Sequence, residues 1–222
     1  MKIGLLFTSL LSLPKSVYLN LRSLPFREAM KLPILVHYNT NIEDLSGKVV
    51  FLQAPSTFCV KFGFTGSYAL GDGGGNFWSN AGIIEFSGKA SFARGTQLIC
   101  GRSGILSFGN NFGSNCNCIF NAGKSVSFGN DCLLSWNVSV LDGDGHLIVD
   151  STSAHTTIQK DSSIVIGNHV WICMNATILK STNVGNDCVI GANSIINKQI
   201  KGDNLVISGI NKVVKEGVNW KQ

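Results

Sequence analysis

The stretch IGNHVWICMNATILKSTNVGNDCVIGANSIINKQI, residues 166–200, decides the fold because its side chains repeat every six residues. The first position of each hexad holds an aliphatic residue: Ile166, Ile172, Ile178, Val184, Ile190 and Ile196. Four positions later stands a residue that is mostly small or β-branched: Val170, Ala176, Thr182, Cys188, Ser194 and Ile200. A fixed period over successive units is the signature of a solenoid. The six hexads therefore predict a coil of short strands and tight turns.

Each hexad is interpreted as one short strand whose large side chain points inward, followed by a corner that the smaller side chain fills. Three hexads make one triangular turn of eighteen residues, so that equivalent side chains stack in columns. A single turn cannot bury its apolar face alone, and stability comes from stacking. The glycines at 167, 185 and 191 would supply backbone conformations that other residues adopt only with strain. We expect an all-β fold, a parallel β-helix.

The same period continues upstream with lower fidelity. It is carried by three runs of mostly aromatic and aliphatic residues: Phe86, Phe92 and Leu98; Phe108, Ser114 and Phe120; Phe128, Leu134 and Val140. The phase slips by two residues between Phe120 and Phe128, which predicts a small bulge or an extended corner. We expect two parts in the chain: a partly helical N-terminal segment, 1–46, with a helix starting after Pro25, and a coil domain, 47–222.

The register disappears between Leu141 and Ser163, so this stretch is expected to leave the coil as a loop. Loops carried on rigid scaffolds commonly hold functional residues. Loop 141–163 contains Asp142-Gly143-Asp144-Gly145-His146. A histidine can act as a general base near neutral pH, and a carboxylate can orient the imidazole. The alternative interpretation is a Gly-Asp turn or a calcium-like loop, but the interruption of a regular coil favours catalysis.

Composition excludes several other classes of function. The net charge is +5 and no block of consecutive Lys or Arg appears, so nucleic-acid binding is not indicated. All four prolines stand at or before residue 55, which leaves the later strands free to pair. Seven cysteines without a CxxC pair favour neither secretory disulfides nor a zinc ribbon. We expect buried free thiols in a reducing compartment, and hence a cytoplasmic protein.

The apolar run at residues 3–13 follows a single Lys2. It lacks a small-x-small cleavage site and is too short to cross a bilayer as a helix. A buried or interface helix is the favoured interpretation, and weak contact with a membrane surface through residues 3–13 is the alternative.

Four segments together resemble a known family: Asp144-Gly145-His146, Ile166–Ile172 with Trp171, Val189–Ser194, and the closing Ser208–Lys215. They are similar to the hexapeptide-repeat O-acetyltransferases of bacterial surface polysaccharides, in the branch of the polysialic acid and capsule O-acetyltransferases. The stretches around Pro14 and Pro25 also resemble the start of these enzymes, so the likeness extends over most of the chain.

The resemblance implies a homotrimer of left-handed coils that binds acetyl-CoA between neighbouring subunits and acts on a carbohydrate acceptor, with no metal. It implies catalytic roles for His146, Asp144 and Trp171, where the indole would shape the acceptor site; simple packing is the alternative for Trp171. Family analogy also indicates a set of residues that would contact acetyl-CoA: Met174, Asn175, Lys180, Gly191, Ala192, Lys198 and Lys212. The three lysines would meet phosphates as point charges.

Two positions depart from the family pattern. The usual Trp-Ile-Gly is Trp171-Ile172-Cys173, and the closing segment is shorter and lacks its proline. Cys173 could crowd a face of the coil or affect the thioester site. These changes bear more on coenzyme A binding than on the fold.

Three other functions use a similar coil. A γ-type carbonic anhydrase needs three histidines around zinc, but the four histidines show no ordered spacing: His37, His146, His155 and His169. A structural or ice-binding coil would carry regular Thr-rich outward faces on all of its turns. Here, in contrast, one polar loop that holds His146 breaks the regularity of the coil. An N-acyltransferase acting on an amino sugar nucleotide shares the fold and co-substrate, and the sequence separates it poorly from an O-acetyltransferase.

Overall fold

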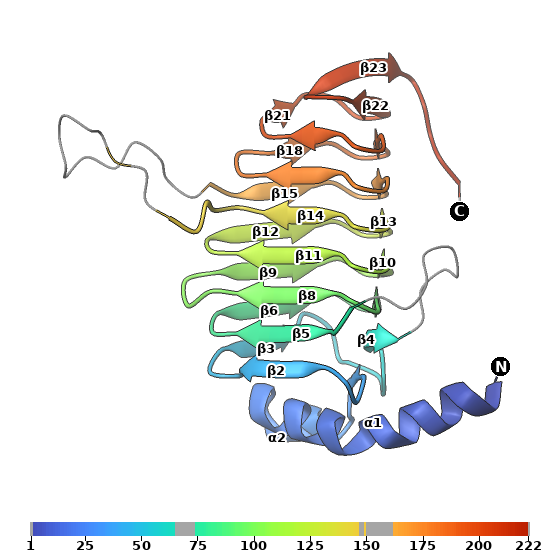
Figure 1. Cartoon of the computed structure of the whole chain (residues 1–222), viewed down its shortest axis with the longest axis vertical. Helices are drawn as coiled ribbons and strands as arrows, with labels where there is room; N and C mark the ends of the chain where they lie inside the picture. Colours follow the sequence, from blue (N-terminus) through green and yellow to red (C-terminus); the bar gives the residue numbers. More distant parts are fainter. Residues whose placement is uncertain (1, 65–73, 147–148, 150–161, 222) are drawn as a thin grey trace.

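The computed structural model describes residues 2–64, 74–146, 149 and 162–221, with side chains from residue 7 onward. The chain winds into a left-handed parallel β-helix whose strands enter three sheets in rotation (Figure 1). A helix lies across the base of the coil. The all-β coil with a small helical N-terminal part predicted from the hexads is confirmed.

Three sheets form the walls of the coil, here called the first, second and third. The first sheet contains β1 (Ile34–Val36), β4 (Val60–Phe64), β7 (Ala90–Ala93), β10 (Phe112–Ser114), β13 (Leu133–Leu134), β16 (Trp171–Ile172), β19 (Val189–Ile190), β22 (Leu205–Ser208) and β23 (Lys212–Glu216). The second contains β2 (Asn41–Asp44), β5 (Phe77–Asn80), β8 (Gln97–Cys100), β11 (Ile119–Ala122), β14 (Ser139–Leu141), β17 (Thr177–Leu179) and β20 (Ile195–Ile196). The third contains β3 (Lys48–Phe51), β6 (Ile83–Phe86), β9 (Ile105–Phe108), β12 (Ser125–Phe128), β15 (Ile164–Ile166), β18 (Asn183–Val184) and β21 (Gln199–Ile200).

The hexad columns form the core. Ile166 pairs with Val184 on the next turn, and Ile172 with Ile190, each an offset of eighteen residues. Every aliphatic residue predicted to point inward from Ile166 to Ile196 is buried, and so is Cys188 at its small corner position. These side chains repeat at the same place on successive turns, so each one covers the one below.

Turns in the N-terminal half are longer. Leu106 pairs with Val126, an offset of twenty residues, and Ile84 with Leu106, an offset of twenty-two. The phase slip before Phe128 is confirmed as a longer turn with four-residue strands in place of the two-residue strands found later. The wider core is filled by stacked rings, and the rings of Phe108 and Phe128 lie parallel with centroids 5.7 Å apart.

The expected conformational role of the hexad glycines is wrong. Residues with positive φ at the corners are instead His169, Asp187 and Asn193. Gly167 is needed because a β-carbon there would lie 2.7 Å from the backbone of Gly185 on the next turn. These glycines allow successive corners to stack closely, while mostly Asn and Asp take the left-handed positions.

The base is made by α1 (Lys2–Ser23) and α2 (Phe26–Ala29), which confirms the helix start after Pro25. The coil begins at β1, ahead of the boundary expected at residue 47. All three residues of β1 are buried, because α1 packs against this strand, so no alternating pattern marks it in the sequence. None of the described helices is long and apolar enough to cross a membrane.

Candidate functional site

The loop root is fixed by Asp142, the first carboxylate of the Asp142–His146 motif. Its side chain is fully buried and accepts hydrogen bonds from the backbone amides of Gly123, Lys124 and Ser125 on the turn below, at 2.6 to 2.8 Å. The backbone carbonyl of Asp142 also accepts a hydrogen bond from the amide of Ser162 at 3.2 Å, which joins the two ends of loop 141–163. A charged acceptor with three amide donors is a strong anchor. Asp142 therefore holds the loop to the coil.

The second carboxylate, Asp144, forms an ion pair with Lys180 on the corner of the next turn. His146 follows two residues later and is exposed. Among the described contacts, the Asp144 carboxylate meets Lys180 rather than His146, so the expected orientation of the imidazole by this carboxylate remains a prediction. The remainder of the loop, with His155, lies mostly outside the described residues.

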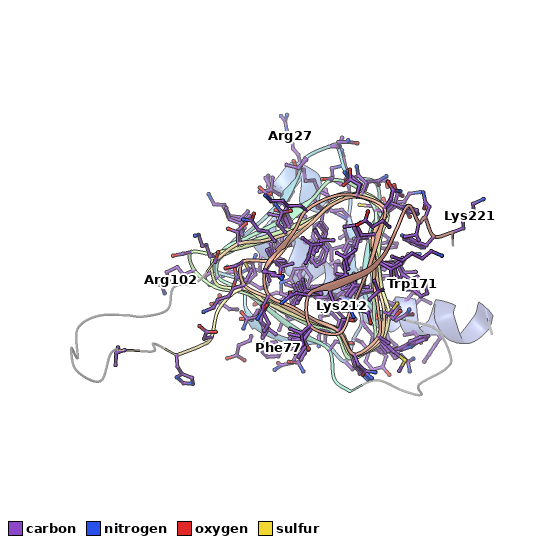
Figure 2. The ribbon with its side chains drawn as sticks, turned by 90° about the horizontal axis from the view of Figure 1, so that it is seen from above. Arg27, Phe77, Arg102, Trp171, Lys212 and Lys221 are labelled. Atoms are coloured by element: carbon purple, nitrogen blue, oxygen red, sulfur yellow. The ribbon has the colours of Figure 1, made fainter. Side chains whose placement is uncertain are left out.

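Trp171 lies on another side of the coil. It is half-buried on β16 of the first sheet, and its indole N–H donates to the Ser135 hydroxyl oxygen at 3.1 Å. Loop 141–163 leaves between β14 and β15, the corner that Arg102 occupies two turns below. Seen from above, Arg102 and Trp171 label opposite sides of the coil (Figure 2). A single chain thus does not bring Trp171 to His146.

The residues predicted to contact acetyl-CoA border the second sheet. Met174 and Asn175 occupy the corner that enters β17, and Gly191 with Ala192 occupies the same corner one turn above. Asn175 donates to the Asn193 side-chain oxygen at 3.2 Å, which ties the two corners together. These two corners border one edge of the second sheet.

Two of the predicted lysines stand at the other edge of the same sheet, and the third, Lys212, opens β23 of the first sheet. Lys180 follows β17 and Lys198 follows β20. Lys212 is brought to this end because its neighbour Asn211 exchanges two hydrogen bonds with Asn197, at 2.6 and 2.9 Å. The structure therefore gathers all seven predicted contact residues around the upper turns of the second sheet.

Sequence reasoning missed two cations on this edge. Arg102 and Lys124 occupy the same corner on the two turns below loop 141–163, and both are exposed. They lie two residues beyond the register position of Lys180 and Lys198. Together they form a basic column beside the loop root, which favours a negatively charged ligand. Their offset from the lysine position explains why the six-residue pattern did not reveal them.

A cluster around the C-terminal tail was also missed. The Trp220 ring stacks on His169 with centroids 4.3 Å apart, and its N–H donates to the His169 carbonyl at 2.7 Å. The His169 Nδ1 lies 2.8 Å from a carboxylate oxygen of Asp187. The Trp220 and Trp171 ring centroids lie 6.0 Å apart. The C-terminal tail therefore packs beside Trp171, the residue predicted to shape the sugar-acceptor site. The sequence signal for this cluster was Trp220, an isolated aromatic residue near the end of the sequence.

The cysteines are free, as predicted, and five of the seven are buried: Cys100, Cys116, Cys118, Cys132 and Cys188. Cys173, which replaces the family glycine, is half-buried at the corner before Met174. Burial raises the pKa of the Cys173 thiol, which keeps it in the neutral form. Within the described ranges no group of three or more His, Cys, Asp and Glu side chains could hold a metal ion.

Comparison with known proteins agrees with this architecture. The family model described as Bacterial transferase hexapeptide (six repeats) matches residues 163–198. WbbJ of Escherichia coli strain K12, whose assigned name is a lipopolysaccharide biosynthesis O-acetyl transferase, is 30% identical over 145 residues, covering 62% of this chain and 74% of WbbJ. The galactoside O-acetyltransferase of the same strain is 32% identical over 117 residues, covering 50% of this chain and 54% of that enzyme.

Among solved structures, the polySia specific acetyltransferase NeuO aligns with a TM-score of 0.48 and 18% identity over 83% of each chain. The identity to WbbJ, its coverage and the hexapeptide match decide the assignment. This chain belongs to the hexapeptide-repeat O-acetyltransferase family and is an acetyltransferase.

Proposed function

We propose that this protein transfers the acetyl group of acetyl-CoA to a sugar hydroxyl of a bacterial surface polysaccharide or of its precursor. The name of WbbJ supports this class of acceptor. The observation that carries the proposal is the exposed His146, held on a loop whose root is fixed by Asp142. A base on a well-anchored loop can meet a bulky carbohydrate at the surface of the coil.

In the proposed reaction, a ring nitrogen of His146 takes the proton of the sugar hydroxyl. The hydroxyl oxygen forms a bond to the thioester carbonyl carbon, the carbon–sulfur bond breaks, and the coenzyme A thiolate takes the proton back from the imidazolium. No oxidant or metal is needed for this balance. Asp144 acts through Lys180, because their ion pair restrains the loop segment that carries His146.

The wall of the second sheet suits acetyl-CoA. Its edge at Gly191 and Ala192 presents backbone groups for an extended amide-containing arm. Its other edge presents Lys198 and Lys212, which would meet the phosphates. The basic column continues down this edge through Arg102 and Lys124. We also propose that the coil, from β1 onward, acts as the catalytic domain and the helical residues before it as an N-terminal segment.

The assembly proposed for this activity is a homotrimer. Trp171 lies across the coil from the corner where loop 141–163 leaves, so a site that uses both residues needs a neighbouring chain. A cytoplasmic location is proposed because the seven cysteines are free and mostly buried, which suits a reducing compartment.

A thiol-release assay with acetyl-CoA and a panel of bacterial surface glycans tests the proposal. The expected result is acceptor-dependent release of coenzyme A with an acetyl group on the glycan that mild base removes, as it would an ester. An acetyl group that resists mild base would identify an amide and contradict O-acetylation. Turnover with no glycan of the panel, together with turnover of an amino sugar nucleotide, would also contradict it.

A further inference from the structure

Helix α1 buries its polar face. The side chains that pack against the coil include Ser12, Ser16, Asn20 and Ser23. Among the fully buried side chains of this helix from Phe7 onward, only Leu19 is apolar. Buried helix faces in globular proteins are normally apolar. The reversed pattern in α1 needs a physical reason, which lies in the strand beneath it.

The reason is the open edge of the first sheet. β1 pairs with β4 on one side, and its other backbone edge faces α1. Asn20 donates to the Ile34 carbonyl at 2.7 Å and accepts from the Ile34 amide at 3.2 Å, as a neighbouring strand would. The Ser16 hydroxyl oxygen accepts from the Val36 amide at 2.9 Å. The polar face of α1 thus satisfies an edge that would otherwise lack partners.

The opposite face of α1 is apolar and exposed. It carries Phe7 (64% exposed), Leu10 (56%), Leu11 (49%), Val17 (37%), Tyr18 (54%) and Leu21 (47%). Their spacing of three, four and seven residues places them on one stripe along the helix. The exposed Phe26 and Met30 follow at the next helix. We call these eight residues the basal stripe. Exposed apolar surface of this extent marks an interaction site.

Charge identifies the chemistry of the partner. Residues 7–30 contain three basic residues, Lys15, Arg22 and Arg27, and one acidic residue, Glu28. They therefore carry +2 of the net charge of +5. Arg22 and Arg27 are exposed beside the basal stripe. An apolar stripe flanked by basic residues is the pattern of a helix that lies in the plane of a membrane surface.

The position of the stripe fits a flat partner. α1 runs across the base of the coil, and its N-terminal half extends past the wall (Figure 1). An open groove of about 560 Å³ beside α1 is lined by Leu11, Pro14 and Tyr18 of the helix and by Tyr38 and Ile42 at the start of the second sheet. Tyrosine is enriched at membrane interfaces, where its ring sits among the headgroups.

We propose that the basal stripe docks this enzyme on a membrane surface that contains acidic phospholipids, with the coil standing away from the bilayer. The apolar side chains enter the boundary between headgroups and acyl chains, and Arg22 and Arg27 meet lipid phosphates. This proposal rests on residues 7–30 and is independent of the acetyl-transfer chemistry at His146. It also extends the weak contact predicted from residues 3–13.

The test is cosedimentation of the full chain with vesicles of two compositions: pure phosphatidylcholine, and phosphatidylcholine with about one quarter phosphatidylglycerol. We expect binding to the acidic vesicles and little binding to the neutral ones. Arg22→Gln together with Arg27→Gln should weaken binding by roughly fivefold per charge. Leu10→Glu together with Leu21→Glu should reduce binding by about tenfold or more, because glutamate opposes both contributions.

The matched control is Ile210→Glu together with Val214→Glu at the other end of the coil, where the side chains (69% and 52% exposed) are at least as exposed as Leu10 and Leu21. This variant should bind acidic vesicles like the wild type. Equal binding of the wild type to both vesicle types, or to neither, would overturn the proposal. So would a fall in oligomer mass for Leu10→Glu/Leu21→Glu without vesicle binding by the wild type, since the stripe would then join copies of this chain.

Discussion

The carboxylate of Asp144 on loop 141–163 pairs with the ammonium of Lys180, thirty-six residues further along the chain and one turn higher on the coil. The loop is thereby attached twice: below through Asp142 and above through Lys180. Family analogy assigns Lys180 to the phosphates of acetyl-CoA. The ion pair instead favours a positioning role, in which Lys180 restrains the segment that carries His146.

Removing either partner should therefore lower activity more than stability. We expect Asp144→Asn and Lys180→Met each to lower kcat/KM about tenfold, and the double variant to lose little more than either alone, because residues in direct contact couple. The pair is partly exposed, so each change should cost at most about 1 kcal/mol of unfolding free energy. Steady-state kinetics with a thermal melt of each variant measures both effects. If the kcat/KM of the double variant fell by the product of the two single losses, the two residues would act separately, which would contradict the prediction.

Replacing Asp142, in contrast, should lower stability strongly. Asp142→Ala leaves three backbone amides without the buried carboxylate that accepts their hydrogen bonds, and is expected to cost about 3 kcal/mol of stability. Asp144→Ala provides the control, because it removes a carboxylate two residues away that is partly exposed. Chemical denaturation of the two variants compares them directly. An equal loss of stability in both would contradict the anchoring role of Asp142.

The base of the coil should be sensitive to acid. Burial, with Arg94 and Lys15 nearby, lowers the pKa of His37 below 6.5, although a hydrogen bond to Asn39 opposes the shift. The unfolded chain therefore takes up a proton before the folded chain does. The contribution of His37 to stability should be complete above pH 6.5 and should fall as the pH drops through the lowered pKa. Thermal melts across this range should show a shallower decline for His37→Gln, and an identical decline would contradict the assignment.

Thiol reactivity should follow burial. Desolvation raises the pKa of Cys118 to about 12 and that of Cys132 to about 11, so both remain protonated near neutrality. Cys59 and Cys173 are only half-buried. With iodoacetamide at about pH 8, peptide mapping should find Cys59 and Cys173 alkylated first. Early alkylation of Cys118 would contradict the burial of this thiol.

The regular part of the fold was predictable because its rule is local. A side chain that must stack on its equivalent in the next turn repeats at a fixed interval, and Ile166 to Ile196 show that interval directly. The two-residue change in the phase of the repeat between Phe120 and Phe128 could be predicted for the same reason. The start of the coil was not, because β1 is buried on both faces and carries no alternation.

The inverted helix could not be predicted from its own residues. An apolar run such as Phe7–Leu13 normally indicates a buried face, and the requirement that reverses it belongs to β1. The same limit applies to the site. Asp142 and Asp144 each precede a glycine in the same motif, and only the neighbouring turns distinguish an anchor from a partner of Lys180.

The most direct test of the account is the activity of His146→Ala. We predict that acceptor-dependent release of coenzyme A falls at least about a hundredfold, the low end of what a general base contributes, while the thermal midpoint and oligomer mass stay at the wild-type values. Val149→Ala, an exposed position on the same loop, should retain activity. A His146→Ala protein that acetylates the glycan at the wild-type rate would contradict the central claim.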